Sequence, residues 1–148
     1  MKSALPDPQQ LGAWRLFLRT HAHLTRVLEA ELLAEHQLTL PSYDVLLQLA
    51  EAPGRRLRMT ELADRVLLSR SGLTRLVDRM EKEGLVERAA CPGDARGTHA
   101  VLTDAGLSRL RAAAPTHLRG VAQHVTEVLS AGELVALRQL MTKLLAAS

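Results

Sequence analysis

The sequence predicts a mainly helical protein with one small β-hairpin. Over most of its 148 residues, apolar side chains recur at three- and four-residue spacing, which is the period of an amphipathic helix. Short alternating stretches typical of strands occur at 56–58, 85–88 and 99–102, and the turn-rich segment 91–97 separates the last two. The composition, 47% hydrophobic and 24% charged, resembles that of an ordinary folded domain and argues against disorder.

The first helix is expected over about 9–35. At 1.5 Å per residue, a helix of this length extends roughly 40 Å. A small domain cannot cover an apolar stripe of that length, so we expect a partner chain to cover part of it. The stripe consists of Trp14, Phe17, Leu18, His21, Leu24, Leu28 and Leu32.

A second helix is expected from about Pro41, because proline is tolerated in the first turn of a helix. Pro53 and Gly54 end this helix, and the segment 56–58 then alternates as a minimal strand does. The apolar positions of the helix are Tyr43, Leu46, Leu47 and Ala50.

Two consecutive helices are expected in the centre of the chain. Thr60 is a candidate N-cap for a short helix over 61–67, and Ser69 is a candidate N-cap for a longer one that ends near Glu83. Gly84 follows at the position where a glycine commonly ends a helix. The inward positions of the short helix are Leu62, Ala63 and Val66.

Two further helices follow the hairpin. Thr103 is the expected N-cap of the first, in which Pro115 and Gly120 predict a kink or break near His117. A capping box of Ser130 and Glu133 begins the last helix. Its apolar stripe consists of Leu134, Leu137, Leu140, Met141 and Leu144.

The order of short helix, tight turn, longer helix and hairpin is that of a winged helix-turn-helix, whose second helix enters the major groove of duplex DNA. Such a helix needs an apolar inner face, which Leu73, Leu76, Val77 and Met80 provide. Its outer face must offer basic and hydroxyl groups to phosphates and base edges. The candidates are Ser69, Arg70, Ser71, Thr74, Arg75 and Arg79. The alternative interpretation is an ordinary amphipathic surface helix with scattered arginines.

The positive charge of the chain is concentrated around this motif. The net charge is +3, and the block 55–99 holds ten Lys/Arg and seven Asp/Glu, which leaves the rest of the chain neutral. This pattern favours a nucleic-acid partner. The block lacks the aromatic residues on which single strands stack, so we expect the partner to be double-stranded DNA. The aromatic residues of the chain are Trp14, Phe17 and Tyr43.

The tip of the hairpin carries a further candidate contact. Arg96 is placed to reach the minor groove, where the negative potential attracts cations, and Thr98 lies two residues further on. Asp94 would brace the Arg96 guanidinium. Alternatively, Asp94 only makes a turn and Arg96 is solvated.

Other classes of protein receive less support. The longest apolar run has four residues (144–147), and the first residues do not form a signal peptide, so we expect a cytoplasmic protein without a membrane partner. There is no nucleophile motif, phosphate-binding glycine loop or metal cluster, which argues against an enzyme and against a cofactor. His21 and His23 are two residues apart on a helix and so do not converge on one metal ion, and His117 and His124 share a face but lack a nearby third ligand. Cys91, which we expect on an exposed turn, is either a redox sensor or an incidental thiol.

Several segments together resemble the MarR family of bacterial transcriptional regulators. They are 57–63 (LRMTELA), 69–80 (SRSGLTRLVDRM), 84–88 (GLVER), 94–96 (DAR) and 102–106 (LTDAG). The resemblance covers about residues 10–146. It implies a homodimer with interleaved first and last helices, in which two winged domains bind a pseudo-palindromic operator. Arg75 and its neighbours would then contact the major groove, and Arg96 the minor groove.

The resemblance also implies a division of the chain and an effector. Residues 9–36 and 103–147 would form a helical dimerisation region, and 40–102 the winged DNA-binding domain. Family members commonly bind small aromatic acids in a cleft between these parts, and the set of Trp14, Asp44 and Arg75 or Arg88 is similar to that of urate- and phenolate-responsive members. The candidate ligand residues are Trp14, Phe17, His21, Tyr43, Asp44 and Arg88. Alternatively, the aromatic residues belong to the core.

The sequence therefore predicts a DNA-binding regulator, most simply a repressor, whose operator affinity depends on a small aromatic or phenolic ligand. Two alternatives remain open. One is a redox-sensing regulator that uses Cys91. The other is a helical protein-interaction dimer without DNA binding, although the set of Arg70, Arg75, Arg79 and Arg96 argues against it.

Overall fold

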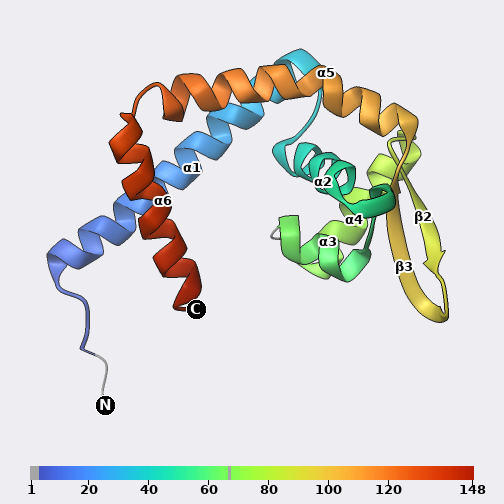
Figure 1. Cartoon of the computed structure of the whole chain (residues 1–148), viewed down its shortest axis with the longest axis horizontal. Coiled ribbons are helices and arrows are strands. Elements are labelled where there is room, and N and C mark those ends of the chain that lie inside the picture. Colours follow the sequence, from blue (N-terminus) through green and yellow to red (C-terminus); the bar gives the residue numbers. More distant parts are fainter. Residues whose placement is uncertain (1–3, 67) are drawn as a thin grey trace.

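The computed structural model describes residues 4–66 and 68–148, with the side chains of all of these except 94–96. Figure 1 shows an arch with α1 and α5 along its top. The N-terminal part of α1 and α6 form one limb, and the remaining elements form the other. In chain order the elements are α1 (Pro8–His36), α2 (Leu40–Glu51), η1 (Pro53–Arg55), β1 (Arg56–Arg58), α3 (Met59–Val66), α4 (Arg70–Lys82), β2 (Val86–Cys91), β3 (Asp94–Leu102), α5 (Asp104–Val121), η2 (Ala122–Thr126) and α6 (Ala131–Ala146).

Side-chain caps begin the helices at most of the predicted positions. The Ser69 hydroxyl accepts a hydrogen bond from the backbone N–H of Gly72, and Thr103 accepts one from Gly106. The capping box of Ser130 and Glu133 is present at the start of α6. These caps satisfy N–H groups that have no partner within the helix, which explains why the helices begin there.

Two predictions about helix ends were wrong. The helix α3 begins at Met59, directly after β1, so Thr60 lies within its first turn instead of capping it. The predicted last residue of that helix, Leu67, lies outside the described residues. The helix α5 continues through His117 to Val121, and the break comes only at the π-helical turn η2. Buried residues on both sides of Pro115, namely Ala113 and Thr116, keep this stretch packed as a helix.

The three strands form an antiparallel sheet in the order β1-β3-β2. The hairpin strands are longer than predicted, because the pairing continues to Ala90 opposite Thr98 and then, after a shift in register, to Cys91 opposite Asp94. The turn is thereby reduced to 92–93, where Gly93 has a φ of +76° that favours glycine. The predicted turn over 91–97 was therefore too long.

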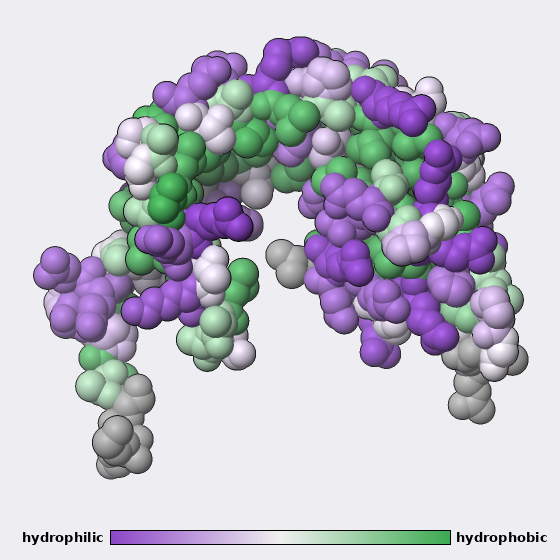
Figure 2. Space-filling model, in the orientation of Figure 1, coloured by the Kyte–Doolittle hydropathy of each residue, from purple (hydrophilic) through white to green (hydrophobic). Residues whose placement is uncertain are grey.

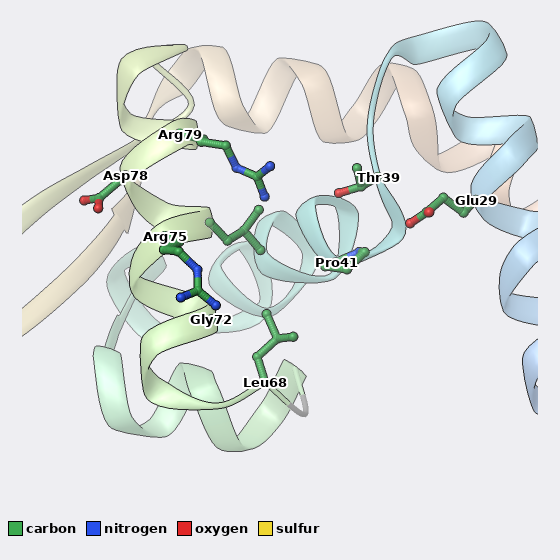
Figure 3. Close-up of a pocket in the computed structure, with 9 residues that line it drawn as sticks. Glu29, Thr39, Pro41, Leu68, Gly72, Arg75, Asp78 and Arg79 are labelled. Carbon is green, nitrogen blue, oxygen red and sulfur yellow. The ribbon is translucent and has the colours of Figure 1, made fainter.

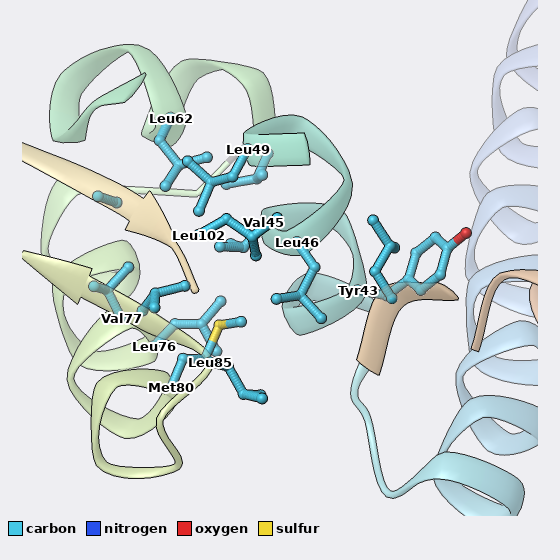
Figure 4. Packing of buried hydrophobic residues seen from close by; sticks show 14 of the residues in the cluster. Tyr43, Val45, Leu46, Leu49, Leu62, Leu76, Val77, Met80, Leu85 and Leu102 are labelled. Carbon is cyan, nitrogen blue, oxygen red and sulfur yellow. The ribbon is translucent and has the colours of Figure 1, made fainter. Parts of the chain in front are cut away.

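The hydrophobic core lies in the limb built from α2, α3, α4 and the sheet. Figure 4 shows side chains from these elements converging, among them Leu46, Leu62, Leu76 and Leu102. By contrast, α1 buries only Leu32, and α6, all of whose residues are described, buries none. The limb built from α2, α3, α4 and the sheet, which we call the winged part, therefore has its own core. The two outer helices, α1 and α6, leave their apolar stripes uncovered.

A close backbone contact joins the end of α4 to the start of α5. The Thr103 hydroxyl donates a hydrogen bond to the carbonyl of Gly84 (2.6 Å), and the Thr103 N–H donates to that of Leu85 (3.2 Å). Gly106 packs against the same Leu85 carbonyl, where a Cβ atom would overlap the oxygen. The segment 102–106 thus fixes the direction in which α5 leaves the winged part.

We expect Gly106→Ala to destabilise the protein by about 2 kcal/mol or more, because the added methyl group would overlap the carbonyl oxygen of Leu85 and the side chain of Leu102. Urea unfolding at a fixed protein concentration measures the effect. Gly132→Ala is the matched control, since a Cβ at that helical position meets nothing within 4 Å. Equal stability of the two variants would contradict this account of the joint.

Candidate nucleic-acid interface

The helix α4 separates its apolar and polar side chains as predicted. Leu73, Leu76, Val77 and Met80 are buried in the core of the winged part. The candidate DNA contacts on the other side of the helix are all exposed: Ser69, Arg70, Ser71, Thr74, Arg75 and Arg79. The helix is therefore held by one face and presents a cationic, hydroxyl-bearing face to solvent.

Hydroxyl groups gather near the N-terminus of α4. The Oγ atoms of Ser69 and Ser71 lie 3.3 Å apart, and the Thr74 hydroxyl donates to the Arg70 carbonyl (2.8 Å). A hydroxyl that donates to its own helix keeps lone pairs for a second partner. The positive end of the helix dipole at this position favours an anion such as a phosphate.

Arg75 and Arg79 also line a cleft between α4 and the start of α2. Figure 3 shows both guanidinium groups pointing into it from α4, towards Thr39 and Pro41. The cleft has a volume of about 660 Å³, and its lining also includes Glu29 of α1, Leu68, and Gly72, Leu76 and Asp78 of α4. A guanidinium fork matches the geometry of a carboxylate, a phosphate or a guanine edge, so these two arginines can serve either DNA or an anionic ligand.

The hairpin of β2 and β3, which we call the wing, contributes Thr98. The side chain of Arg96 lies outside the described part. Thr98 lines a second cleft together with Thr74 of α4, so the structure brings these two predicted contacts together. Arg58 and Thr60 line the same cleft, and neither is among the DNA contacts predicted from the sequence. They lie at the start of the first helix of the motif, which crosses the DNA backbone in helix-turn-helix proteins. This position in the sequence could have identified both residues as candidate DNA contacts.

The predicted ligand residues do not form one cluster. Trp14 and Phe17 stack with ring centroids 6.0 Å apart near the start of α1, where they are 56% and 42% exposed. Tyr43 is buried, with its ring centroid 4.5 Å from that of His117. Tyr43 therefore belongs to the core, as in the alternative interpretation, whereas Trp14 and Phe17 are exposed in the single chain. Both residues belong to the N-terminal half of α1, and Figure 1 shows this end of the helix in the limb opposite the winged part.

Two of these candidates, His21 and Asp44, line the same cleft. It lies between α1 and α2, has a volume of about 450 Å³ and is also lined by Arg26, Glu29 and Pro41. Glu29 and Pro41 also line the cleft of Arg75 and Arg79, so the two clefts adjoin.

Arg88 lies on the opposite side of α4, where β2 runs back beside the helix. Its guanidinium contacts Asp78 at 2.6 Å and Glu81 at 3.2 Å, and it donates to the Thr74 carbonyl. The structure thus separates Arg88 from the other ligand candidates, because the turn after α4 reverses the chain direction.

Cys91 is buried, with only 4% of its surface exposed, so the prediction of an exposed thiol was wrong. The strand β2 extends through this residue, which turns its side chain inwards. Its Sγ atom lies 3.9 Å from Nε2 of His99. Among the described residues, no group of three His, Cys, Asp or Glu side chains is arranged to hold a metal ion.

Burial shifts the titration of three groups between α2 and α5. It raises the pKa of Tyr43 and of Asp44, and it lowers the pKa of His117. The charge of Asp44 opposes the shift of His117, and the charge of His117 opposes that of Asp44. His117 therefore favours its neutral form in the folded protein.

The fold and the two-faced helix define a winged helix-turn-helix DNA-binding protein. A family model described as "MarR family" matches residues 36–97. The HTH-type transcriptional regulator TtmR of Methylorubrum extorquens is 40% identical over 101 residues, which is 68% of this chain and 51% of TtmR. An uncharacterized HTH-type transcriptional regulator of Bacillus cereus is 34% identical over 116 residues, which is 78% of this chain and 76% of that protein.

Solved structures agree over nearly the whole chain. Sco3205, a MarR family transcriptional regulator from Streptomyces coelicolor in complex with DNA, has a TM-score of 0.91 and 35% identity, and the match covers 98% of this chain and 91% of that one. A mutant MarR from E. coli, complexed with operator DNA, has a TM-score of 0.82 and 27% identity over 95% of this chain and 99% of that one.

The chain belongs to the MarR family. It is therefore a MarR-type DNA-binding transcriptional regulator and not an enzyme. In the described part of the chain, we find no helix with the length and apolar character that crossing a membrane requires.

The shift of His117 predicts a pH dependence of stability. Because the folded state lowers its pKa from 6.5, the unfolded state binds more protons, and stability falls as the pH falls through about 6.5. We expect His117→Gln to reduce this slope, which for one group is at most about 1.4 kcal/mol per pH unit. Urea unfolding at several pH values between about 5.5 and 7.5 measures it around the ordinary pKa of histidine. Identical slopes in both proteins would refute the assignment.

Proposed function

We propose that this protein is a sequence-specific repressor whose helix α4 lies in the major groove of its operator. The observation that carries the proposal is the division of α4 into a fully buried apolar face and an exposed face with Arg70, Arg75 and Arg79. A helix anchored in this way can enter a groove without loss of its core contacts. The crystal complexes of Sco3205 with DNA and of the MarR mutant with operator DNA support the same partner here.

Individual contacts follow from the chemistry of each side chain. Arg75 and Arg79 carry the bidentate forks that suit guanine, and Arg70 is placed for a phosphate. The hydroxyls of Ser69, Ser71 and Thr74 suit phosphates or base edges near the N-terminus of α4. On the wing, Arg96 would enter the minor groove and Thr98 would contact the adjoining backbone. Residues 40–102 would thus form the DNA-binding domain.

A homodimer would explain the uncovered outer helices. In Figure 2, hydrophobic side chains reach the surface along the limb of α1 and α6, whereas the winged limb is mainly hydrophilic. Residues 9–36 and 103–147 would pair with the same region of a second chain. Two α4 helices would then lie one DNA turn apart, roughly 34 Å, over a pseudo-palindromic operator. The exposed side chains include Trp14, Leu16, Phe17, Leu18, Val135, Leu137, Leu140, Leu144 and Leu145.

An anionic aromatic molecule would act as the effector by binding between α1 and the winged part. The adjoining clefts there offer cationic groups on Arg26, Arg75 and Arg79 beside the apolar surface of Pro41 and Leu68. A ligand bound to Arg75 and Arg79 would withdraw them from DNA and would change the separation of the two α4 helices. Its binding would release the operator and end the repression that arises when the dimer occupies promoter DNA.

Fluorescence anisotropy with a labelled duplex, selected from a random-sequence library, tests the DNA interface. We expect two chains per duplex and an affinity that falls steeply with salt, because bound phosphates release counterions. Arg75→Ala should cost roughly 1–3 kcal/mol at one base position if its fork contacts a guanine. A uniform loss over all sequences would make Arg75 a phosphate contact, and a lack of duplex binding by the wild type at low salt would refute the proposed function.

Thermal unfolding with a panel of benzoates, phenolates and purines tests the effector. We expect an anionic aromatic compound to stabilise the DNA-free protein, by about 2.7 kcal/mol at 100 times its Kd, and to release the duplex over the same concentration range. Arg79→Gln should weaken this stabilisation. Arg70→Gln, with the same charge change outside the cleft lining, is the control. A panel without any shift would contradict a ligand of this class.

A further inference from the structure

Arg88 makes a dense set of contacts with one side of the recognition helix. Its guanidinium contacts the carboxylates of Asp78 and Glu81 and donates to the Thr74 carbonyl. In addition, its backbone N–H donates to the second carboxylate oxygen of Glu81 at 3.1 Å. One side chain on β2 thus reaches two turns of α4.

The spacing of its partners explains how one arginine contacts all of them. Thr74, Asp78 and Glu81 are separated by four and three residues, so they lie along the same side of a helix. Figure 3 shows Asp78 pointing to the side of α4 opposite Arg75 and Arg79. Arg75 and Arg79 are therefore directed away from the two carboxylates, although Asp78 also contributes to the lining of their cleft. Arg70 precedes Thr74 by one turn and shares the side of Asp78 and Glu81, the acidic side, on which Arg88 binds both carboxylates.

The acidic side is a problem for a helix that binds DNA. The segment 70–82 carries four Lys/Arg and two Asp/Glu, and both acids are partly exposed, at 52% and 42% of their side chains. In a groove lined by phosphates on both sides, two uncompensated carboxylates would repel the DNA. Arg88 supplies a charge of the opposite sign within hydrogen-bonding distance of both.

We propose that Arg88 is a positioning residue for DNA binding, which neutralises the two carboxylates of α4 and fixes the helix against the wing. The inference rests on the proposed DNA interface, and it gives Arg88 a role different from the ligand contact that the sequence predicted. Arginine suits this role better than lysine because its planar fork can hold two carboxylates and a carbonyl at once.

Anisotropy titrations with the selected duplex and with an unrelated duplex test the role of Arg88. We expect Arg88→Gln to weaken binding to both duplexes by about tenfold, the order expected for unit charges across partly solvated protein. The loss should shrink between about 0.05 and about 0.3 M KCl, because salt screens the exposed carboxylates. Arg111→Gln, which removes the same charge from an exposed site on α5, should change binding less than twofold.

Removal of the carboxylates separates neutralisation from a purely mechanical role. We expect Arg88→Gln combined with Asp78→Asn and Glu81→Gln to recover affinity to within about threefold of wild type, because no buried or uncompensated charge remains. A mechanical clamp would stay broken in this triple variant, so an unrecovered affinity would overturn the proposal.

One further variant keeps the test decisive if Arg88→Gln does not fold, as judged by circular dichroism. Asp78→Asn with Glu81→Gln leaves Arg88 in place and removes both acids. Affinity equal to or above that of wild type supports neutralisation, and a loss comparable to that expected for Arg88→Gln would refute it. These results are interpreted only if the wild type binds the duplex. If the wild type binds and the variants behave against expectation, the role of Arg88 is wrong; if the wild type does not bind, the proposed function itself is wrong.

Discussion

The structure depends on the anchoring of α4 by a single apolar face. Leu73, Leu76, Val77 and Met80 are buried against α2, α3 and the sheet, so the orientation of the helix is set by the core and not by its polar side chains. This leaves the arginine-bearing face free for a groove. The same burial determines where the hairpin must run, because Val86 of β2 and Leu102 of β3 have to reach that core. The position of the wing beside α4 follows from this constraint.

A second constraint separates the two limbs of the arch. The winged limb encloses its own hydrophobic core, whereas α1 and α6 expose large apolar side chains such as Phe17 and Leu140. The joint at Thr103 and Gly106 connects the two limbs through backbone contacts to Gly84 and Leu85, at the end of α4. A change in the outer helices would therefore reach the recognition helix through a short and closely packed connection.

The charged side chains of α4 have different neighbours on two sides of the helix. Arg75 and Arg79 face a cleft that Glu29 and the start of α2 close on the other side, so the same two guanidinium groups are the proposed contacts for DNA and for an anionic effector. Competition between an effector and DNA would then need no long-range signal. On the other side, Arg88 compensates the charges of Asp78 and Glu81, so these two carboxylates oppose the positive charge of the helix less strongly.

The sequence by itself determined the order of the elements, most helix caps and the two faces of α4. These are local properties, since apolar spacing and capping residues act within a few positions of the chain. Tertiary structure decided which distant side chains meet. Sheet pairing extended β2 through Cys91 and buried it, packing carried α5 past Pro115, and the reversal after α4 placed Arg88 on Asp78 instead of near Trp14. Such contacts depend on how elements cross in space, which no short stretch of sequence encodes.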